Sequence, residues 1–73
     1  MILYSREGCA PCVALKKWLN HKKIQYEVKD VDEAGVLDEL IKLTGQMSVP
    51  VVKIDNRVVV GLDYGSIMKT QLL

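Results

Sequence analysis

Two cysteines, Cys9 and Cys12, are the only ones among the 73 residues of the chain, and two positions separate them. They follow a short apolar run and stand at the start of a stretch with helical periodicity, where a strand gives way to a helix. Two thiols at this spacing can close into a small disulfide, and the positive end of a helix can stabilise one of them as a thiolate. The spacing therefore indicates a reversible redox pair.

The order of reaction of the two thiols follows from their positions. A free cysteine, with a pKa near 8.5, is mostly protonated at neutral pH, and only the thiolate attacks a disulfide. Lowering the pKa of Cys9 to about 7 requires roughly 2 kcal/mol, whereas a helix N-terminus supplies about 0.3–1 kcal/mol, so a specific hydrogen bond is also needed. If Cys9 is the N-cap, Pro11 has no N–H to give, and the N–H of Cys12 is the expected donor. We expect Cys9 to attack and Cys12, one turn deeper, to resolve.

Composition limits the class of protein. The chain is 49% apolar and 26% charged, with a formal net charge of +1, which is ordinary for one globular domain spanning residues 1–73. Such a balance provides no field that attracts nucleic acid or a membrane surface. No apolar run approaches the roughly 20 residues of a membrane span, and no basic-then-apolar leader precedes the first expected strand. We expect a cytoplasmic monomer without nucleic-acid or membrane partners.

The use of cysteine is consistent with that compartment. A bridge across so short a loop stabilises a fold by only about 2 kcal/mol. Secreted domains of this size usually carry several long-range bridges, whereas cytosolic disulfides are more often catalytic or transient. The pair is therefore better suited to chemistry than to holding the fold together.

The first half of the chain predicts two strands, each followed by a helix. Apolar residues predict a strand near residues 1–5, and Leu15, Trp18 and Leu19 recur at helical spacing within a helix expected from Pro11 to Lys23. The lysines of that helix are interpreted as a solvated face and a basic last turn: Lys16, Lys17, Lys22 and Lys23. His21 has no second histidine to share a metal, so we expect a surface position.

A half-buried edge strand is predicted for Gln25–Val31, with Tyr26, Val28 and Asp30 on one face. The acidic pair Asp32-Glu33 predicts the first turn of a second helix, and Gly45 predicts its left-handed end. The apolar stripe of this helix comprises Val36, Leu37, Leu40, Ile41 and Leu43. Two strands joined by a helix are most easily parallel, so a βαβ unit is expected.

The second half predicts a β-hairpin and a last helix. Val51–Ile54 and Arg57–Val60 are apolar runs separated only by Asp55-Asn56, two turn-forming residues. A helix is expected from Tyr64 to Leu72, with Ile67, Met68 and Leu72 on one side. The resulting order, β-α-β-α-β-β-α, predicts an α/β fold with a four-stranded mixed sheet flanked by three helices.

This element order, with Cys-x-x-Cys at the first helix and Ser48-Val49-Pro50 before the hairpin, resembles the thioredoxin superfamily and, within it, the glutaredoxins. It is most similar to small bacterial glutaredoxin-like proteins, including the NrdH-redoxins that serve ribonucleotide reductase and a YruB-type group. Three segments spread along the whole chain carry the resemblance: Tyr4–Cys12, Leu43–Pro50 and Val59–Asp63. The insert Ala10-Pro11 and the sequence Val60-Gly61-Leu62-Asp63 differ from the usual Pro-Tyr and Gly-Gly-x-Asp of glutaredoxins.

The resemblance implies a dithiol-disulfide oxidoreductase that reduces protein or glutathione-mixed disulfides, with no tightly bound cofactor. Either glutathione or a thioredoxin-reductase-like flavoenzyme is the implied electron donor. It further implies a cis Val49-Pro50 bond opposite the cysteines, with the backbone of Val49 turned toward an incoming thiol peptide, which would pair with it as an added strand.

The resemblance also implies where glutathione would bind. Arg6 stands where glutaredoxins commonly have a lysine for the carboxylate of glutathione, and Asp63 stands where an acidic residue meets its ammonium group, with Leu62 contributing only backbone. Each position has a simpler interpretation: Arg6 as a solvated loop residue and Asp63 as the N-cap of the last helix. Because two features of the family's site differ here, weak use of glutathione is expected.

A metal or iron–sulfur module is the alternative function. In that case Cys9 and Cys12 would ligate zinc or a shared cluster. Two thiolates are only half of a four-coordinate site, so a second chain or outside ligands would be required, and Pro50 would crowd the metal. Redox exchange is therefore the favoured hypothesis.

Overall fold

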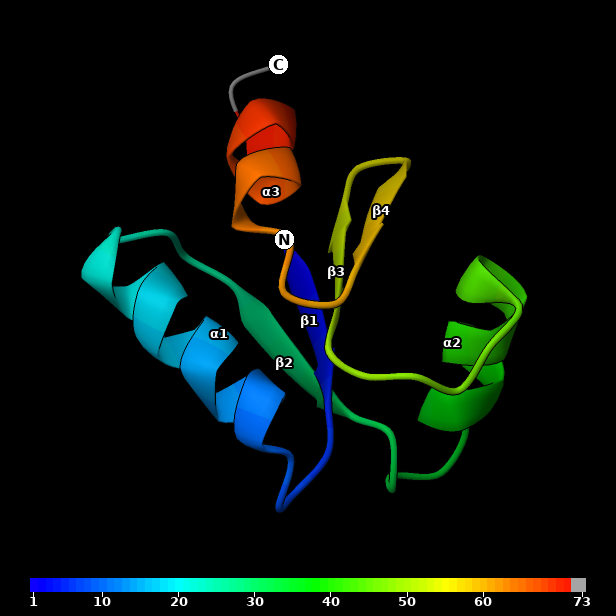
Figure 1. Ribbon diagram of the computed structural model, residues 1–73. Helices are drawn as coiled ribbons and strands as arrows, with labels where there is room; N and C mark the ends of the chain where they lie inside the picture. The colour runs from blue at the N-terminus through cyan, green and yellow to red at the C-terminus, as the bar shows by residue number, and fades with distance from the viewer. Residues whose placement is uncertain (72–73) are drawn as a thin grey trace.

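The computed structural model describes residues 1–71, which form one four-stranded sheet and three helices (Figure 1). The elements in chain order are β1 (Ile2–Ser5), α1 (Ala10–His21), β2 (Glu27–Asp30), α2 (Val36–Thr44), β3 (Val51–Ile54), β4 (Arg57–Val60) and α3 (Tyr64–Gln71). This is the order that the sequence predicts. None of the helices within residues 1–71 is long and apolar enough to cross a membrane.

The strand order of the sheet is β2-β1-β3-β4, so β2 is an edge strand as expected. β1 runs parallel to β2 and antiparallel to β3, and β3 is antiparallel to β4. Tyr4 pairs with Val51, and Val51 pairs with Val60. The C-terminal ends of β1 and β4 and the N-terminal end of β3 therefore meet at one end of the sheet, which we call the cysteine end because the loop after β1 leads to Cys9.

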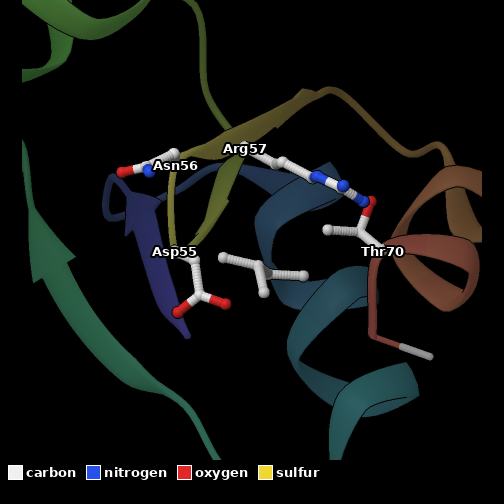
Figure 2. A pocket seen from close by; sticks show the side chains of 5 residues that line it. Asp55, Asn56, Arg57 and Thr70 are labelled. Carbon is white, nitrogen blue, oxygen red and sulfur yellow. The ribbon is translucent and has the colours of Figure 1, made fainter. Parts of the chain in front are cut away.

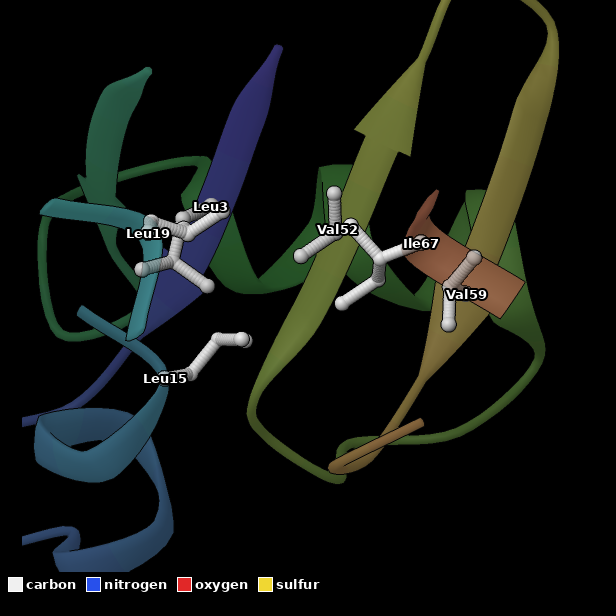
Figure 3. Packing of buried hydrophobic residues seen from close by; sticks show 6 residues of the cluster. All are labelled: Leu3, Leu15, Leu19, Val52, Val59 and Ile67. Carbon is white, nitrogen blue, oxygen red and sulfur yellow. The ribbon is translucent and has the colours of Figure 1, made fainter. Parts of the chain in front are cut away.

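Helices cover both faces of the sheet. In Figure 1, α1 and α3 lie on one face and α2 on the other. The first face forms the larger core cluster, shown in Figure 3: Leu3, Leu15, Leu19, Val52, Val59 and Ile67. Trp18 of α1 and Tyr64 of α3 pack beside this cluster with ring centroids 4.6 Å apart, which joins the two helices.

The α2 face contains a second cluster that includes a polar network. Tyr4 is almost fully buried there with Leu40, and its hydroxyl donates to Oε2 of Glu39 at 2.8 Å. Nζ of Lys29 on β2 also donates to that carboxylate, at 3.1 Å. Burial, then the hydrogen bond to Glu39 and the charge of Glu39, raise the pKa of Tyr4 to about 12. The network thus ties α2 to β1 and β2.

Two predicted helix boundaries are wrong. α1 ends at His21, which is exposed as expected, and Lys22 and Lys23 lie in the turn beyond it, where Lys23 has a left-handed φ of 59°. α2 begins at Val36 instead of Asp32-Glu33, because the side chain of Asp30 accepts the N–H of Asp32 and holds the chain in a turn. The predicted end of α2 is confirmed, with Gly45 at φ 74°.

Four smaller predictions concern the length of β2, the α2 stripe, the end of α3 and the hairpin. β2 is shorter than the predicted Gln25–Val31, and Val28 is 45% exposed because an edge strand is incompletely covered by helices. Ile41 is 38% exposed, so it lies at the margin of the α2 stripe instead of inside it. Leu72, expected on the buried side of α3, lies outside the described residues. The hairpin is confirmed, with Asp55 at a left-handed φ of 54°.

Candidate active site

Cys9 is the N-cap of α1, and it forms a disulfide with Cys12. Its carbonyl accepts the N–H of Val13 at 3.1 Å, which is the first hydrogen bond of the helix. The N–H of Cys12 donates to Sγ of Cys9 at 3.2 Å, the donor that the sequence predicts. A backbone donor is thus already directed at the sulfur that would carry negative charge after reduction.

The two sulfurs differ in accessibility. Cys9 is half-buried, and Cys12, in the first turn of α1, is completely buried. Between them, Ala10 and Pro11 are exposed and occupy the first two helical positions, where the missing N–H of proline costs no helical hydrogen bond. A substrate sulfur arriving from solvent can therefore reach Cys9 but not Cys12.

The loop from α2 to β3 approaches the cysteine end of the sheet through Val49 and Pro50. Their peptide bond is cis, as the resemblance to thioredoxin-like proteins implied. Pro50 is buried, and its carbonyl accepts the N–H of Gly61 at 2.9 Å, which joins this loop to the one after β4. Val49 is half-buried, and within residues 1–71 no backbone hydrogen bond joins it to another residue. Its N–H and C=O therefore have no backbone partner among the described residues.

Arg6 lies beside Cys9, whose N–H donates to the carbonyl of Arg6 at 3.3 Å. The guanidinium has a partner within the chain, because Nε of Arg6 is 3.5 Å from Oδ1 of Asp32. The sequence pattern had predicted that Asp32 lies in the first turn of a helix, and the ion pair of Asp32 with Arg6 was not predicted. The parallel pairing of Ser5 with Asp30 could have placed the two loops side by side.

Asp63 also has a partner within the chain. Oδ1 accepts the N–H of Ser66 at 3.1 Å, and Oδ2 accepts its hydroxyl at 2.7 Å, so Asp63 caps α3. The side-chain and backbone hydrogen bonds from Ser66 hold the pKa of the Asp63 carboxyl below its usual value. Leu62, immediately before it, is 44% exposed. Both charged side chains that the resemblance assigns to glutathione binding therefore already have partners within this chain.

In the part of the chain that the structure describes, no group of three or more histidine, cysteine or acidic side chains is close enough together to hold a metal ion.

A hollow outside the cysteine site lies between the β3–β4 turn and α3, as Figure 2 shows, and is lined by Ile54, Asp55, Asn56, Arg57 and Thr70. It lies at the opposite end of the sheet from Cys9, because Lys53 and Ile54 lead away from the strand end at Val51.

Comparison with known proteins agrees with this geometry. The Glutaredoxin family model matches residues 1–59. A curated relative, an uncharacterized glutaredoxin-like 8.6 kDa protein in the rubredoxin operon of Clostridium pasteurianum, is 32% identical over 68 residues, which are 92% of this chain and 91% of that protein.

Solved structures similar to this one have the same fold. The thioredoxin-like protein BC3987 superposes with a TM-score of 0.85 at 31% identity, covering 94% of this chain and 96% of that one. A glutaredoxin from Archaeoglobus fulgidus gives a TM-score of 0.86 at 22% identity over 96% and 83% of the two chains. A buckwheat glutaredoxin–glutathione complex gives 0.73 at 25% identity over 97% and 66%. The predicted fold is thereby confirmed as thioredoxin-like.

Proposed function

This chain belongs to the glutaredoxin family and is a thiol–disulfide oxidoreductase, and we propose that it reduces protein disulfides through attack by Cys9 and resolution by Cys12. The observation that carries the proposal is the contrast between the accessible sulfur of Cys9, with the N–H of Cys12 directed at it, and the buried sulfur of Cys12.

The reaction proceeds in two exchanges. The Cys9 thiolate attacks one sulfur of a substrate disulfide, forms a mixed disulfide with it, and releases the other substrate sulfur as a thiolate that takes up a proton. Cys12 then loses its proton and attacks Sγ of Cys9. This second step forms the Cys9–Cys12 disulfide and releases the reduced substrate. The protein is then oxidised by two electrons and must be reduced by a donor.

The geometry supports both steps. The hydrogen bond from the Cys12 N–H is charge-assisted when Cys9 is a thiolate, and the N-terminus of α1 adds a favourable dipole. The Cα atoms of the disulfide-bonded cysteines are 5.2 Å apart, within the usual range for a disulfide, so the first turn of α1 accommodates the closed ring. The free backbone groups of Val49 can hold the substrate peptide as an added strand during the attack.

A flavoenzyme is the better candidate for the electron donor than glutathione. Arg6 is paired with Asp32, and both oxygens of Asp63 are bonded to Ser66, so glutathione would compete with these contacts for its binding groups. Losing about 1.4 kcal/mol of binding in this way would weaken glutathione tenfold. The resemblance to the NrdH-redoxins makes the disulfide of ribonucleotide reductase a candidate target.

Insulin-disulfide reduction tests the function and the donor together. The protein is recharged in parallel by glutathione with its reductase, by a bacterial thioredoxin reductase, and by a chemical dithiol. We expect turnover with the chemical dithiol, loss of that turnover in Cys9→Ser, and glutathione-supported turnover of about a tenth of it or less. Absence of turnover with every donor would contradict the function, whereas equal turnover with glutathione would contradict only the choice of donor.

A further inference from the structure

The Arg6–Asp32 ion pair lies on the surface that surrounds the reactive cysteine. The hydrogen bond from the N–H of Cys9 to the carbonyl of Arg6 holds the backbone of Arg6 in the turn that leads to Cys9. The side chains of Arg6 and Asp32 are 45% and 62% exposed, so both remain accessible to a bound substrate. The residues next to a substrate's disulfide would therefore encounter this pair.

Asp32 is held at its place by the backbone. Its N–H donates to Oδ1 of Asp30 at 2.8 Å, and the N–H of its buried neighbour Val31 donates to the carbonyl of Ser5 at 2.9 Å. The loop after β2 is thus fastened to the end of β1, immediately before Arg6. The proximity of Asp32 to Arg6 follows from sheet pairing and not only from the rotamers of the two side chains.

The surroundings of the pair are acidic. The two segments involved, residues 5–9 and 30–35, have a formal charge of −3. Arg6 is their single cation, and their four carboxylates belong to Glu7, Asp30, Asp32 and Glu33. Lys29, the lysine nearest to these segments in sequence, is bonded to Glu39 on α2. Lys16 lies seven residues after Cys9, which is about 10 Å along a helix. This distance is about one Debye length at 0.1 M salt, so its charge is largely screened at Cys9.

We propose that Asp32 is a specificity-determining residue, which neutralises Arg6 and makes Cys9 favour disulfides flanked by lysine or arginine over those flanked by carboxylates. The inference rests on the proposed function, because it concerns which disulfides Cys9 attacks. Glutathione, which carries two carboxylates and one ammonium group, belongs to the disfavoured class. Asp32 itself takes no part in the exchange; it acts on the charge that the substrate meets.

The expected effect is modest because the pair is exposed. Exposed ion pairs contribute about 0–1 kcal/mol, which corresponds to a change of up to about fivefold in a rate ratio. Salt at about 1 M shortens the Debye length to about 3 Å and should remove most of the preference.

Two peptide substrates test the proposal. They are S-methyl mixed disulfides of one sequence, identical except that the residues on both sides of the half-cystine are lysine in one and glutamate in the other. The wild-type protein, recharged by an uncharged chemical dithiol, should reduce the lysine peptide with a several-fold higher kcat/KM. Asp32→Asn should lower the lysine-to-glutamate ratio by about two- to fivefold.

Two further variants separate charge selection from a structural role. Arg6→Gln leaves the charge of Asp32 without its partner, so the ratio should rise, opposite to the change in Asp32→Asn. Asp55→Asn makes the same chemical change in the β3–β4 turn, at the far end of the sheet, and should leave the ratio unchanged. If Asp32→Asn and Arg6→Gln move the ratio in the same direction, or if Asp32→Asn leaves it unchanged, the proposal is wrong. If the protein reduces neither of the two peptides, the result instead contradicts the proposed function.

Discussion

Replacing Tyr4 by phenylalanine tests how α2 is fastened to the sheet. The substitution keeps the buried ring and removes one hydroxyl, which donates to Oε2 of Glu39 at 2.8 Å. Hydrogen bonds to charged groups contribute about 1.5–3 kcal/mol, but Glu39 is half exposed and keeps its bond to Lys29. We therefore expect Tyr4→Phe to lower the free energy of unfolding by about 1–2 kcal/mol, which corresponds to roughly 4–16 °C in Tm for a domain of this size.

The same residue gives a dependence on alkaline pH. Because the pKa of Tyr4 is raised to about 12, the folded state favours the neutral phenol more than the unfolded state does. The resulting stabilisation is fully present below pH 10, the usual pKa of tyrosine, and is lost as the pH rises through 12. The two units correspond to about 2–3 kcal/mol, so the stability of the wild-type protein should fall by this amount more than that of Tyr4→Phe.

Urea unfolding of the oxidised protein between pH 7 and pH 12 measures both effects. Tyr26→Phe is the control for loss of a tyrosine hydroxyl, because Tyr26 is partly buried and no side-chain hydrogen bond from its hydroxyl occurs within residues 1–71. That control should lose little stability at pH 7. Equal losses in the two variants, or parallel pH profiles of the wild-type protein and Tyr4→Phe above pH 10, would refute the assigned network.

Three other outcomes follow from the structure. Leu40→Ala, which empties a fully buried position, should cost about 2–5 kcal/mol in urea unfolding, whereas Ile41→Ala at its exposed neighbour should cost far less; similar costs would contradict the assigned face of α2. Asp63→Asn should reduce Tm by a few degrees at neutral pH and weaken the decline of Tm in acid. The lowered pKa of the Asp63 carboxyl stabilises the fold above its usual value of 3.8, and this stabilisation is lost as the pH falls. A Tm profile from pH 5 to pH 2 that matches wild type would exclude this cap. Protein purified without oxygen should contain no stoichiometric zinc or iron by elemental analysis, and one metal per chain or per dimer would favour the metal-module alternative.

The order of the elements was predictable because each leaves its own local pattern. Leu15, Trp18 and Leu19 recur with a helical period, and Asp55-Asn56 separates two apolar runs at the length of a tight hairpin turn. The cap of α1 was predictable for a similar reason, since the missing N–H of Pro11 leaves one suitable backbone donor for the Cys9 sulfur.

Features that depend on the meeting of distant segments were not predictable. The acidic pair Asp32-Glu33 resembles a first helical turn, but the side chain of Asp30 binds the N–H of Asp32, and Gly35 reverses the chain with φ 84° before α2 begins. The partner of Arg6 was missed because it lies across a strand pairing instead of within one element. The candidate site residues and the capping role of Asp63 could thus be proposed from sequence, whereas the partner of Arg6 could not.

Trapping of the mixed disulfide identifies the thiol that attacks the substrate. Reduced Cys12→Ser protein, mixed with an oxidised protein substrate, should accumulate a covalent one-to-one adduct because attack can occur but resolution cannot. Mass spectrometry of its peptides should show the substrate sulfur joined to Cys9, and reduced Cys9→Ser protein should form little adduct, because its Cys12 sulfur is buried. Adduct formation through Cys12 at a comparable rate in Cys9→Ser would contradict the assignment of Cys9 as the attacking thiol.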